Sequence, residues 1–153
     1  MSSTTIALFE QNSDHASTLR AMLAQFPALT VRCYDTPAAL LQDDEHVDVY
    51  VLGLDDLGSA ETDFLAKLRA TQNGMIAGIA LCSAKEEQEL VRAFEEHDFD
   101  SFVSKDWVSP AQMYLAVTAA LRSARWRLNH KCAVHGMPNL RCGSTITFPE
   151  AAE

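Results

Sequence analysis

Residues 47–53 read Val-Asp-Val-Tyr-Val-Leu-Gly, a short and nearly all apolar run that ends on a glycine. A run of this length and character is typical of a strand that is covered on both faces of a parallel sheet. Four further runs share this character: Thr5–Phe9, Thr30–Tyr34, Ile76–Cys82 and Ser101–Ser104. The sequence therefore predicts five buried strands.

Stretches with helical period separate these runs, and most of them open with a residue that caps helices. The expected signals are Asn12 or Ser13, Thr36-Pro37, Ser59 with Thr62, Ser83 or Ala84, and Ser109-Pro110, with Pro27 and Asn73-Gly74 as ends. Five strand–helix repeats predict an α/β fold, a flavodoxin-like (βα)5 three-layer sandwich whose parallel sheet has the order 2-1-3-4-5. Such sheets place their sites at the carboxyl ends of the strands.

The charge of the chain is unevenly distributed. Residues 1–121 hold 7 Lys/Arg against 19 Asp/Glu, whereas residues 122–153 hold 5 against 2, within a total of −9. An acidic body repels nucleic acid and membrane surfaces. With no signal-peptide pattern and no apolar run long enough to span a membrane, we expect a cytoplasmic protein that does not bind membranes.

Cysteine usage and loop composition exclude other classes. The four cysteines form no CxxC pair and are expected to be reduced thiols, with Cys33 and Cys82 buried in strands. The turn after the first strand contains no glycine, which argues against dinucleotide or Walker-type phosphate binding. Residues 1–128 are expected to form one domain, and residues 129–153 a linker or tail.

The ordered set of motifs resembles response-regulator receiver domains of the CheY-like family. Residues 6–12 match the first strand and its acidic turn, residues 47–53 match the strand that ends at the phosphoryl acceptor, and residues 100–105 match the fifth strand with its lysine. Residues 4–128 carry the resemblance, about four-fifths of the chain. It implies a non-enzymatic signalling module.

The resemblance also implies a pocket that has lost part of its chemistry. Its positions are Glu10 and Gln11 for the acidic pair, Gly53 for the acceptor aspartate, Asp55 for a backbone carbonyl, Ser83 for the hydroxyl and Lys105 for the lysine. Glycine has no nucleophile, and Gln11 has no charge where a carboxylate is expected. We therefore expect no catalytic residue and weak or absent Mg²⁺ binding.

Several residues have two readings that the sequence leaves open. Ser83 either belongs to the degenerate pocket or caps the following helix. Lys105 either keeps its family role or pairs with Glu10. Phe102 stands at the aromatic switch position of the family, and core packing is the favoured explanation of it.

The segment after the last helix is interpreted in two ways. His130, Cys132, His135 and Cys142 do not have the spacing of a zinc site, so no metal is expected there. Residues 140–150 resemble the opening strands of the winged-helix output domain of OmpR/PhoB-class regulators, although a β-prone linker has the same composition. DNA binding is expected only through such an output domain, which this chain lacks.

These observations lead to a phosphorylation-independent receiver that regulates an output, with transcription as the favoured one. The alternatives are a stand-alone interaction module that binds another signalling protein, and a small-ligand or redox sensor that uses the degenerate pocket. We also expect a homodimer through the last helix, at Tyr114, Ala116, Arg122 and Trp126. An open alternative is that Trp126 covers the core of the monomer.

Overall fold

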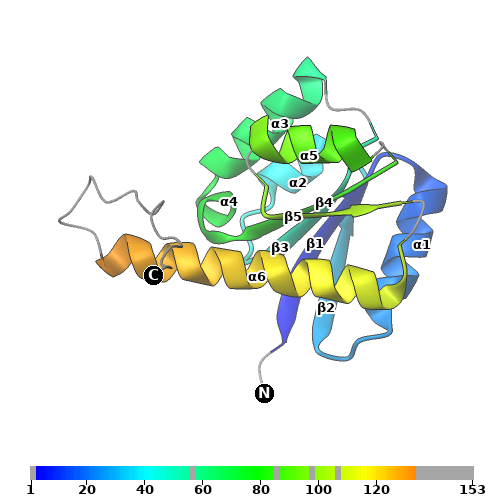
Figure 1. The fold of residues 1–153 in the computed structure, drawn as a ribbon. Helices are drawn as coiled ribbons and strands as arrows, with labels where there is room; N and C mark the ends of the chain where they lie inside the picture. Colours follow the sequence, from blue (N-terminus) through cyan, green and yellow to red (C-terminus); the bar gives the residue numbers. More distant parts are fainter. Residues whose placement is uncertain (1–2, 56–57, 85–86, 97–98, 106–107, 134–153) are drawn as a thin grey trace, which may run out of the picture.

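The computed structural model describes residues 3–55, 58–84, 87–96, 99–105 and 108–133. Its strands form one parallel sheet of order β2-β1-β3-β4-β5 (Figure 1). They are β1 (Thr4–Glu10), β2 (Leu29–Tyr34), β3 (Val49–Gly53), β4 (Gly78–Ser83) and β5 (Ser101–Ser104). The predicted fold class and strand order are confirmed.

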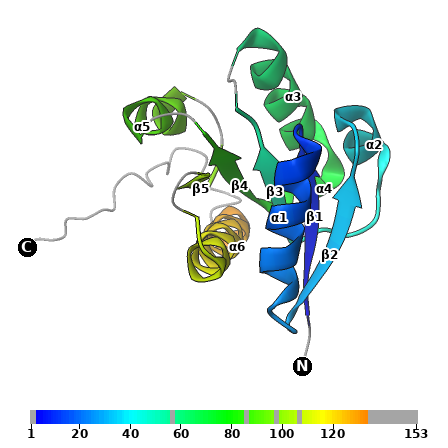
Figure 2. The same cartoon turned by 90° about the vertical axis from the view of Figure 1, so that its right-hand side faces the viewer.

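Helices cover both faces of this sheet, which makes three layers (Figure 2). They are α1 (Ser13–Ala24), α2 (Pro37–Gln42), α3 (Ser59–Ala70), α4 (Gln72–Ile76), α5 (Glu87–Glu96) and α6 (Pro110–Ala133). Helices α1 and α6 pack on one face, and α2, α3 and α5 on the other. None of the described helices is long and apolar enough to cross a membrane.

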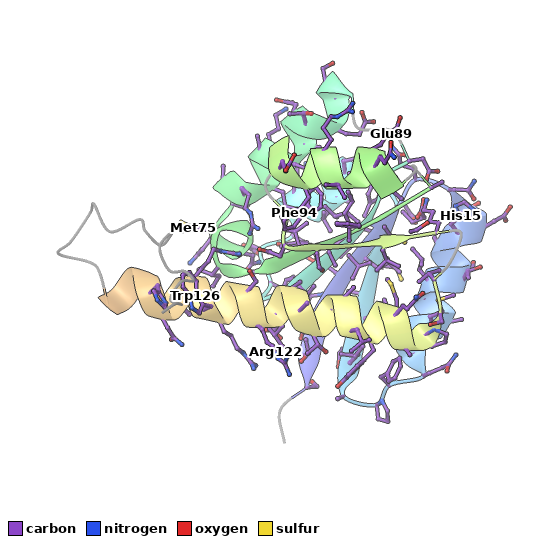
Figure 3. All side chains as sticks on the ribbon, in the orientation of Figure 1. His15, Met75, Glu89, Phe94, Arg122 and Trp126 are labelled. Atoms are coloured by element: carbon purple, nitrogen blue, oxygen red, sulfur yellow. The ribbon has the colours of Figure 1, made fainter. Side chains whose placement is uncertain are left out.

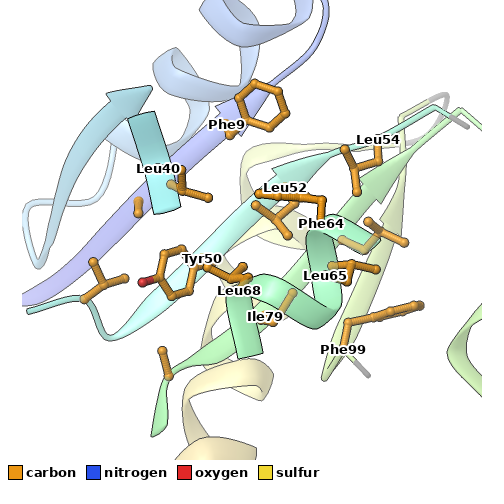
Figure 4. Close-up of a cluster of buried hydrophobic side chains, with 14 of the residues drawn as sticks. Phe9, Leu40, Tyr50, Leu52, Leu54, Phe64, Leu65, Leu68, Ile79 and Phe99 are labelled. Atoms are coloured by element: carbon orange, nitrogen blue, oxygen red, sulfur yellow. The ribbon is translucent and has the colours of Figure 1, made fainter. Parts of the chain in front are cut away.

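Each face of the sheet has its own apolar core, because side chains alternate along every strand. Phe9, Tyr50 and Leu52 point to the side of α2, α3 and α5, where they join a cluster that Figure 4 shows. Leu8 and Val51 point to the opposite side, toward α1 and α6. Burial on both faces explains why β1, β3 and β4 are nearly continuous apolar runs.

The two cysteines expected in strands differ in exposure. Cys82 is buried in β4, as predicted, but Cys33 is exposed. The prediction for Cys33 was wrong because β2 is an edge strand of the sheet, where burial is incomplete. A strand-like pattern does not by itself distinguish an edge strand from a central one.

Three of the predicted helix starts are confirmed by side-chain caps. Asn12 Oδ1 accepts a hydrogen bond from the Asp14 N–H at 2.9 Å. Thr36 Oγ1 accepts from Ala39 at 3.1 Å, and the Ser109 hydroxyl accepts from Gln112 at 3.2 Å. Each cap satisfies a backbone donor that the helix itself leaves unpaired.

Helix α3 begins differently from the prediction that Ser59 with Thr62 caps it. Gly58 is the residue at the N-cap position, and its N–H donates to the Glu61 carboxylate at 3.1 Å. The Thr62 hydroxyl donates to the Gly58 carbonyl at 2.9 Å instead of capping the helix. A carboxylate in the first turn is favourable at the positive end of the helix, so the start does not need a hydroxyl cap.

The chain after α3 forms an extra short helix where the sequence suggested a helix end. Thr71 Oγ1 accepts from the Gly74 N–H at 2.9 Å and thereby caps α4. A Cβ at position 74 would lie 1.7 Å from the Leu68 carbonyl oxygen, so this close approach requires glycine. Ile76 therefore ends α4, and β4 begins at Gly78, two residues later than predicted.

The start of β3 also lies later than predicted, at Val49 instead of Val47. The Asp48 carboxylate accepts a hydrogen bond from the Thr5 N–H at 2.8 Å, where the side chain takes the role of a strand carbonyl. Val47 is still buried, so it is apolar because it packs in the hydrophobic core, although it forms no part of strand β3.

Asp100 anchors the last helix to the sheet. Its buried carboxylate accepts from the Ile79 N–H at 2.8 Å, from Arg69 at 3.0 Å and from Arg127 on α6. Helix α6 continues to Ala133, five residues into the segment that the sequence assigned to a linker. Residues 134–153, including the predicted winged-helix start, lie outside the described residues.

Candidate functional site

The carboxyl ends of the strands bring four of the predicted pocket residues to one edge of the sheet. Glu10 lies beside Gly53 in the β1–β3 register, and Gly53 lies beside Cys82 in the β3–β4 register. Ser83 ends β4, and the Lys105 N–H donates to its carbonyl at 2.8 Å. Strand β3 ends at Gly53, so Asp55 lies in the loop beyond it.

The carboxylate of Glu10 fills the space above Gly53. A Cβ built on Gly53 would lie 1.7 Å from Glu10 Oε1 and 2.4 Å from the carboxyl carbon. Glu10 Oε2 accepts a hydrogen bond from the Asn12 N–H at 3.0 Å, and the Glu10 side chain has no exposed surface. At the position where the family has its acceptor side chain, this protein therefore holds a side chain from the neighbouring strand.

Lys105 completes this arrangement from β5. Its Nζ lies 2.8 Å from Glu10 Oε2, 2.7 Å from Asp55 Oδ1 and 3.2 Å from His15 Nδ1. Burial alone would lower the pKa of Lys105, but the hydrogen bonds and charges of Asp55 and Glu10 outweigh it and raise this pKa above its ordinary value. The lysine is therefore an ammonium ion at neutral pH, and the pairing with Glu10 that the sequence left open is observed.

Asp55 provides the second carboxylate of the group. It is partly exposed, and besides Lys105 it accepts a hydrogen bond from the Ala84 N–H at 3.3 Å. Burial raises the pKa of this carboxyl group, but the hydrogen bond and charge of Lys105 outweigh it and lower the pKa below its ordinary value. Asp55 therefore contributes its side chain to the pocket, whereas the family resemblance assigned it only a backbone carbonyl.

The remaining predicted pocket residues take different positions. Gln11 is exposed, and its amide donates to Glu61 at 3.5 Å, so it does not belong to the group around Lys105. Ser83 is fully buried, and the first described residue of α5 is Glu87, four residues further on. Phe102 is half-buried and packs against Phe94 and Phe99, which supports core packing at the switch position.

His15 is the pocket residue that the sequence reasoning missed. Asn12 caps α1, and its oxygen also accepts from the His15 N–H at 3.3 Å, which holds the first turn of α1 above the ends of β1 and β5. A histidine three residues after a cap that follows the first strand must lie near this edge, so the signal was present. Among the described residues, Glu10, His15 and Asp55 are the group whose donor atoms lie close enough together for a metal, within 4.8 Å of one another.

A small cavity of about 110 Å³ adjoins Lys105, lined by His15, Thr18, Leu19, Ala84, Lys105 and Val108. Pockets for drug-sized ligands have volumes of roughly 300–1,000 Å³, so this cavity does not favour the ligand-sensor alternative. Burial raises the pKa of the Cys82 thiol to about 12. A buried thiol with this pKa is unreactive at neutral pH, so the redox alternative gains no support either.

The expected interface residues do not share one surface. Ala116 is buried in the core, so its prediction as an interface residue was wrong. The Tyr114 ring packs at a tilt against Phe26, which follows α1, with ring centroids 4.5 Å apart within the monomer. Arg122 and Trp126 are exposed on α6 (Figure 3), and Trp126 is stacked on His130 and 51% exposed. Trp126 therefore does not cover the core.

Comparison with known structures places this fold among receiver domains. The chain is similar to the receiver domain of a sensor histidine kinase from Pseudomonas aeruginosa, whose structure has a magnesium ion coordinated in the active-site cleft. The identity is 15% over 79% of this chain and 99% of that one, and the TM-score is 0.64. It is similar to a CheY-like receiver domain protein from Methanospirillum hungatei at 13% identity over 82% and 98%, with a TM-score of 0.64.

A third similar structure is the RcsB response regulator of Salmonella typhimurium, at 14% identity over 97% of this chain and 78% of that one, with a TM-score of 0.64. No protein-family model and no curated protein matches the chain. At these identities the likeness shows the fold, and the fold is that of response-regulator receiver domains.

The pocket of this chain does not fit the magnesium ion that the fold implies. Mg²⁺ demands nearly octahedral oxygen coordination at about 2.0–2.1 Å. Here Gly53 offers no ligand and Gln11 is turned toward Glu61. The Lys105 ammonium also lies among the donors that remain. A second cation at this position would meet a positive charge at contact distance.

Proposed function

We propose that this chain is a signal-transduction receiver domain that works without phosphorylation and regulates an output, transcription, through protein–protein contacts. The observation that supports this proposal best is the Glu10 carboxylate above Gly53, in the space of the acceptor side chain. The fold provides the surfaces of a signalling module, whereas the pocket lacks the nucleophile that phosphoryl transfer requires. We therefore propose no enzymatic activity.

Asp55 is the residue of the pocket that could be considered as a substitute acceptor, because its carboxylate is partly exposed. It is bound by the Lys105 ammonium at 2.7 Å and by the Ala84 N–H at 3.3 Å. An attack on phosphorus also needs a cation that neutralises the transferring group. In this pocket the Lys105 ammonium is already paired with both Glu10 and Asp55, so Asp55 lacks the setting of an acceptor.

The test is treatment with acetyl phosphate and Mg²⁺, followed by intact mass spectrometry, with beryllofluoride binding followed by spectroscopic titration. We expect no covalent adduct and no spectral change. The matched control is Asp55→Asn, which removes the partly exposed carboxylate of the pocket but keeps the shape of the side chain. A stable adduct of about 80 Da on the wild type that is absent from Asp55→Asn would contradict the proposal.

The proposed partner is a second copy of the chain, which binds through α6. Leu115, Arg122 and Trp126 are exposed along this helix, and aromatic and arginine side chains dominate the binding energy of interfaces. The exposed side of α5 is acidic at Glu89 and Glu95, which complements the basic end of α6. Another signalling protein with an acidic docking surface is the alternative partner.

Sedimentation velocity at low and high salt tests the dimer. We expect a dimer that persists at high salt, because Trp126 and Leu115 provide apolar contact. Trp126→Ala should weaken it. Leu128→Ala is the control, because Leu128 is similarly exposed but lines a separate groove with Ile76 and Leu121. A wild-type monomer at tens of micromolar in both salts would refute the dimer.

A further inference from the structure

The strongest unexplained feature is a lysine at the centre of three metal-type donors. Glu10 Oε2, Asp55 Oδ1 and His15 Nδ1 come from β1, the β3–α3 loop and α1, and all three lie between 2.7 and 3.2 Å from Lys105 Nζ. We infer that the Lys105 ammonium is the resident cation of this pocket and keeps Glu10, His15 and Asp55 from binding a divalent metal ion.

Charge and burial support this inference. The Lys105 side chain is 6% exposed and that of Glu10 is fully buried, so water does little to screen the attraction between their charges. A buried carboxylate without a partner is strongly unfavourable; Glu10 is buried, and the partly exposed Asp55 adds a second negative charge beside it. With the ammonium present the three charged groups sum to −1. The lysine is therefore the cation that makes the pair of carboxylates tolerable.

Glu10 Oε1 is a carboxylate oxygen that could bind a further cation or hydrogen-bond donor besides Lys105. This atom is buried and receives no hydrogen bond from a described residue. A buried carboxylate oxygen without a partner is rare in folded proteins and calls for a donor or a cation. Oε2 of the same carboxylate contacts the ammonium, so the unpartnered oxygen lies next to the position that Lys105 holds.

The donor set also determines which metal would replace the lysine. Two carboxylates and one imidazole favour Zn²⁺, Co²⁺ or Ni²⁺, whereas Mg²⁺ prefers oxygen ligands alone. The neutral form of His15 is the form that would bind a metal. A side chain of residue 105 without charge would thus uncover a three-ligand site for a transition metal, different from the magnesium site that the fold implies.

The consequence for regulation is that the occupancy of the cation position is fixed by the sequence. The ammonium belongs to the side chain of Lys105, directly after β5, so unlike a metal ion it cannot dissociate from the pocket. It connects the end of β5 to β1, to the first turn of α1 and to the loop after β3. This inference rests on the proposed function for its meaning in signalling, but it concerns cation binding and is tested without phosphorylation or a partner.

The experiment compares the wild type with Lys105→Met, which keeps the length of the side chain but removes its charge. Each protein is titrated with Mg²⁺, Zn²⁺ and Co²⁺ by calorimetry, and the Co²⁺ samples are followed by their visible absorption. We expect no binding to the wild type at submillimolar concentrations. Lys105→Met should bind Co²⁺ and Zn²⁺ at least about tenfold more tightly than the wild type, and more tightly than Mg²⁺.

Two further variants keep the test decisive. Adding His15→Ala to Lys105→Met should abolish most of the gained affinity, because it removes the imidazole ligand. Lys105→Gln is neutral but still donates to the carboxylates, and it replaces Lys105→Met if circular dichroism shows that the latter does not fold. Wild-type affinity for Co²⁺ equal to that of the folded neutral variants would overturn the inference, as would a gain that His15→Ala leaves unchanged. A failure of this kind leaves the phosphorylation test untouched, since that test measures a covalent adduct.

Discussion

Gly53→Asp would place a new carboxyl group in the space that the Glu10 carboxylate fills. Even the first atom of the new side chain, its Cβ, would lie 1.7 Å from Glu10 Oε1, so Glu10 must move. Its displacement puts two interactions of Oε2 at risk, those with the Asn12 N–H at 3.0 Å and with Lys105 Nζ at 2.8 Å. The variant tests whether Gly53 and Glu10 form one steric unit.

The magnitude follows from these contacts. Hydrogen bonds to charged groups contribute roughly 1.5–3 kcal/mol each, and the loss of one to two of them gives a destabilisation of about 1.5–6 kcal/mol. Removal of a glycine restricts the unfolded chain and offsets only about 0.4–1 kcal/mol of this. The new carboxylate raises the negative charge around a single ammonium, so Gly53→Asp should be less stable than Gly53→Ala, which introduces the clash alone.

Urea unfolding of the wild type, Gly53→Asp, Gly53→Ala and the double variant Gly53→Asp/Glu10→Ala provides the assay. The double variant should recover much of the lost stability, because the carboxylate at position 53 then takes the vacated place and pairs with Lys105. We expect a coupling free energy above about 1 kcal/mol between positions 10 and 53. Additive effects, or a Gly53→Asp variant as stable as the wild type, would refute the steric account.

The same variant is informative about magnesium. Gly53→Asp alone should not create a strong Mg²⁺ site, because divalent affinity rises with the number of charged ligands and position 11 still lacks its carboxylate. Gly53→Asp/Gln11→Asp should bind Mg²⁺ more tightly in a calorimetric titration. Equal affinity of the single and double variants would show that the charge at position 11 does not limit the site.

Three further predictions concern other parts of the molecule. Burial and the hydrogen bond to Asp43 raise the pKa of Tyr34 to about 12. The contribution of Tyr34 to the free energy of unfolding should therefore be present below about pH 10 and be lost as the pH rises through about 12. Absorbance at 295 nm should show one tyrosine fewer titrating near pH 12 in Tyr34→Phe than in the wild type. Cys82 should resist iodoacetamide in the native protein while Cys33 reacts, and peptide mapping that finds native Cys82 alkylated would contradict its burial. Asp100→Asn should lower the free energy of unfolding by about 3 kcal/mol in urea, because it removes the buried carboxylate that pairs with the partly buried Arg69 and Arg127; a change below about 0.5 kcal/mol would be inconsistent with the network.

The sequence predicted the features that depend on local chemistry. Apolar runs identified the five strands, and Asn12, Thr36 and Ser109 identified three helix starts, because caps act within one turn. The resemblance alone was enough to predict that Gly53 stands at the acceptor position. The short helix α4 was missed because its glycine is explained by a close contact with Leu68, which no local pattern encodes.

Features that depend on contacts between distant elements could not be predicted in the same way. Sequence reasoning left Lys105 with two readings, and only the geometry places Glu10, His15 and Asp55 around it. Ala116 was assigned to a surface because the position was taken from a family alignment. Its burial depends on how α6 lies on β4 and β5, and this is a tertiary property.

The charges of the pocket connect Gln11 and Gly53 with the position of the Lys105 side chain. A receiver pocket with two acidic residues, an acceptor aspartate, a lysine and Mg²⁺ holds three negative and three positive charges. Replacement by Gln11 and Gly53 removes two negative charges, and without Mg²⁺ two positive charges are removed as well. The charge of Glu10 is then balanced by Lys105, whose Nζ lies 2.8 Å from Glu10 Oε2. The side chain of Asp55 adds one further carboxylate and is drawn to the same ammonium at 2.7 Å. If Gly53 stands where the resemblance places the acceptor aspartate, Gly53→Asp alone adds a negative charge to a group that already sums to −1, which is why the variant should be less stable than Gly53→Ala.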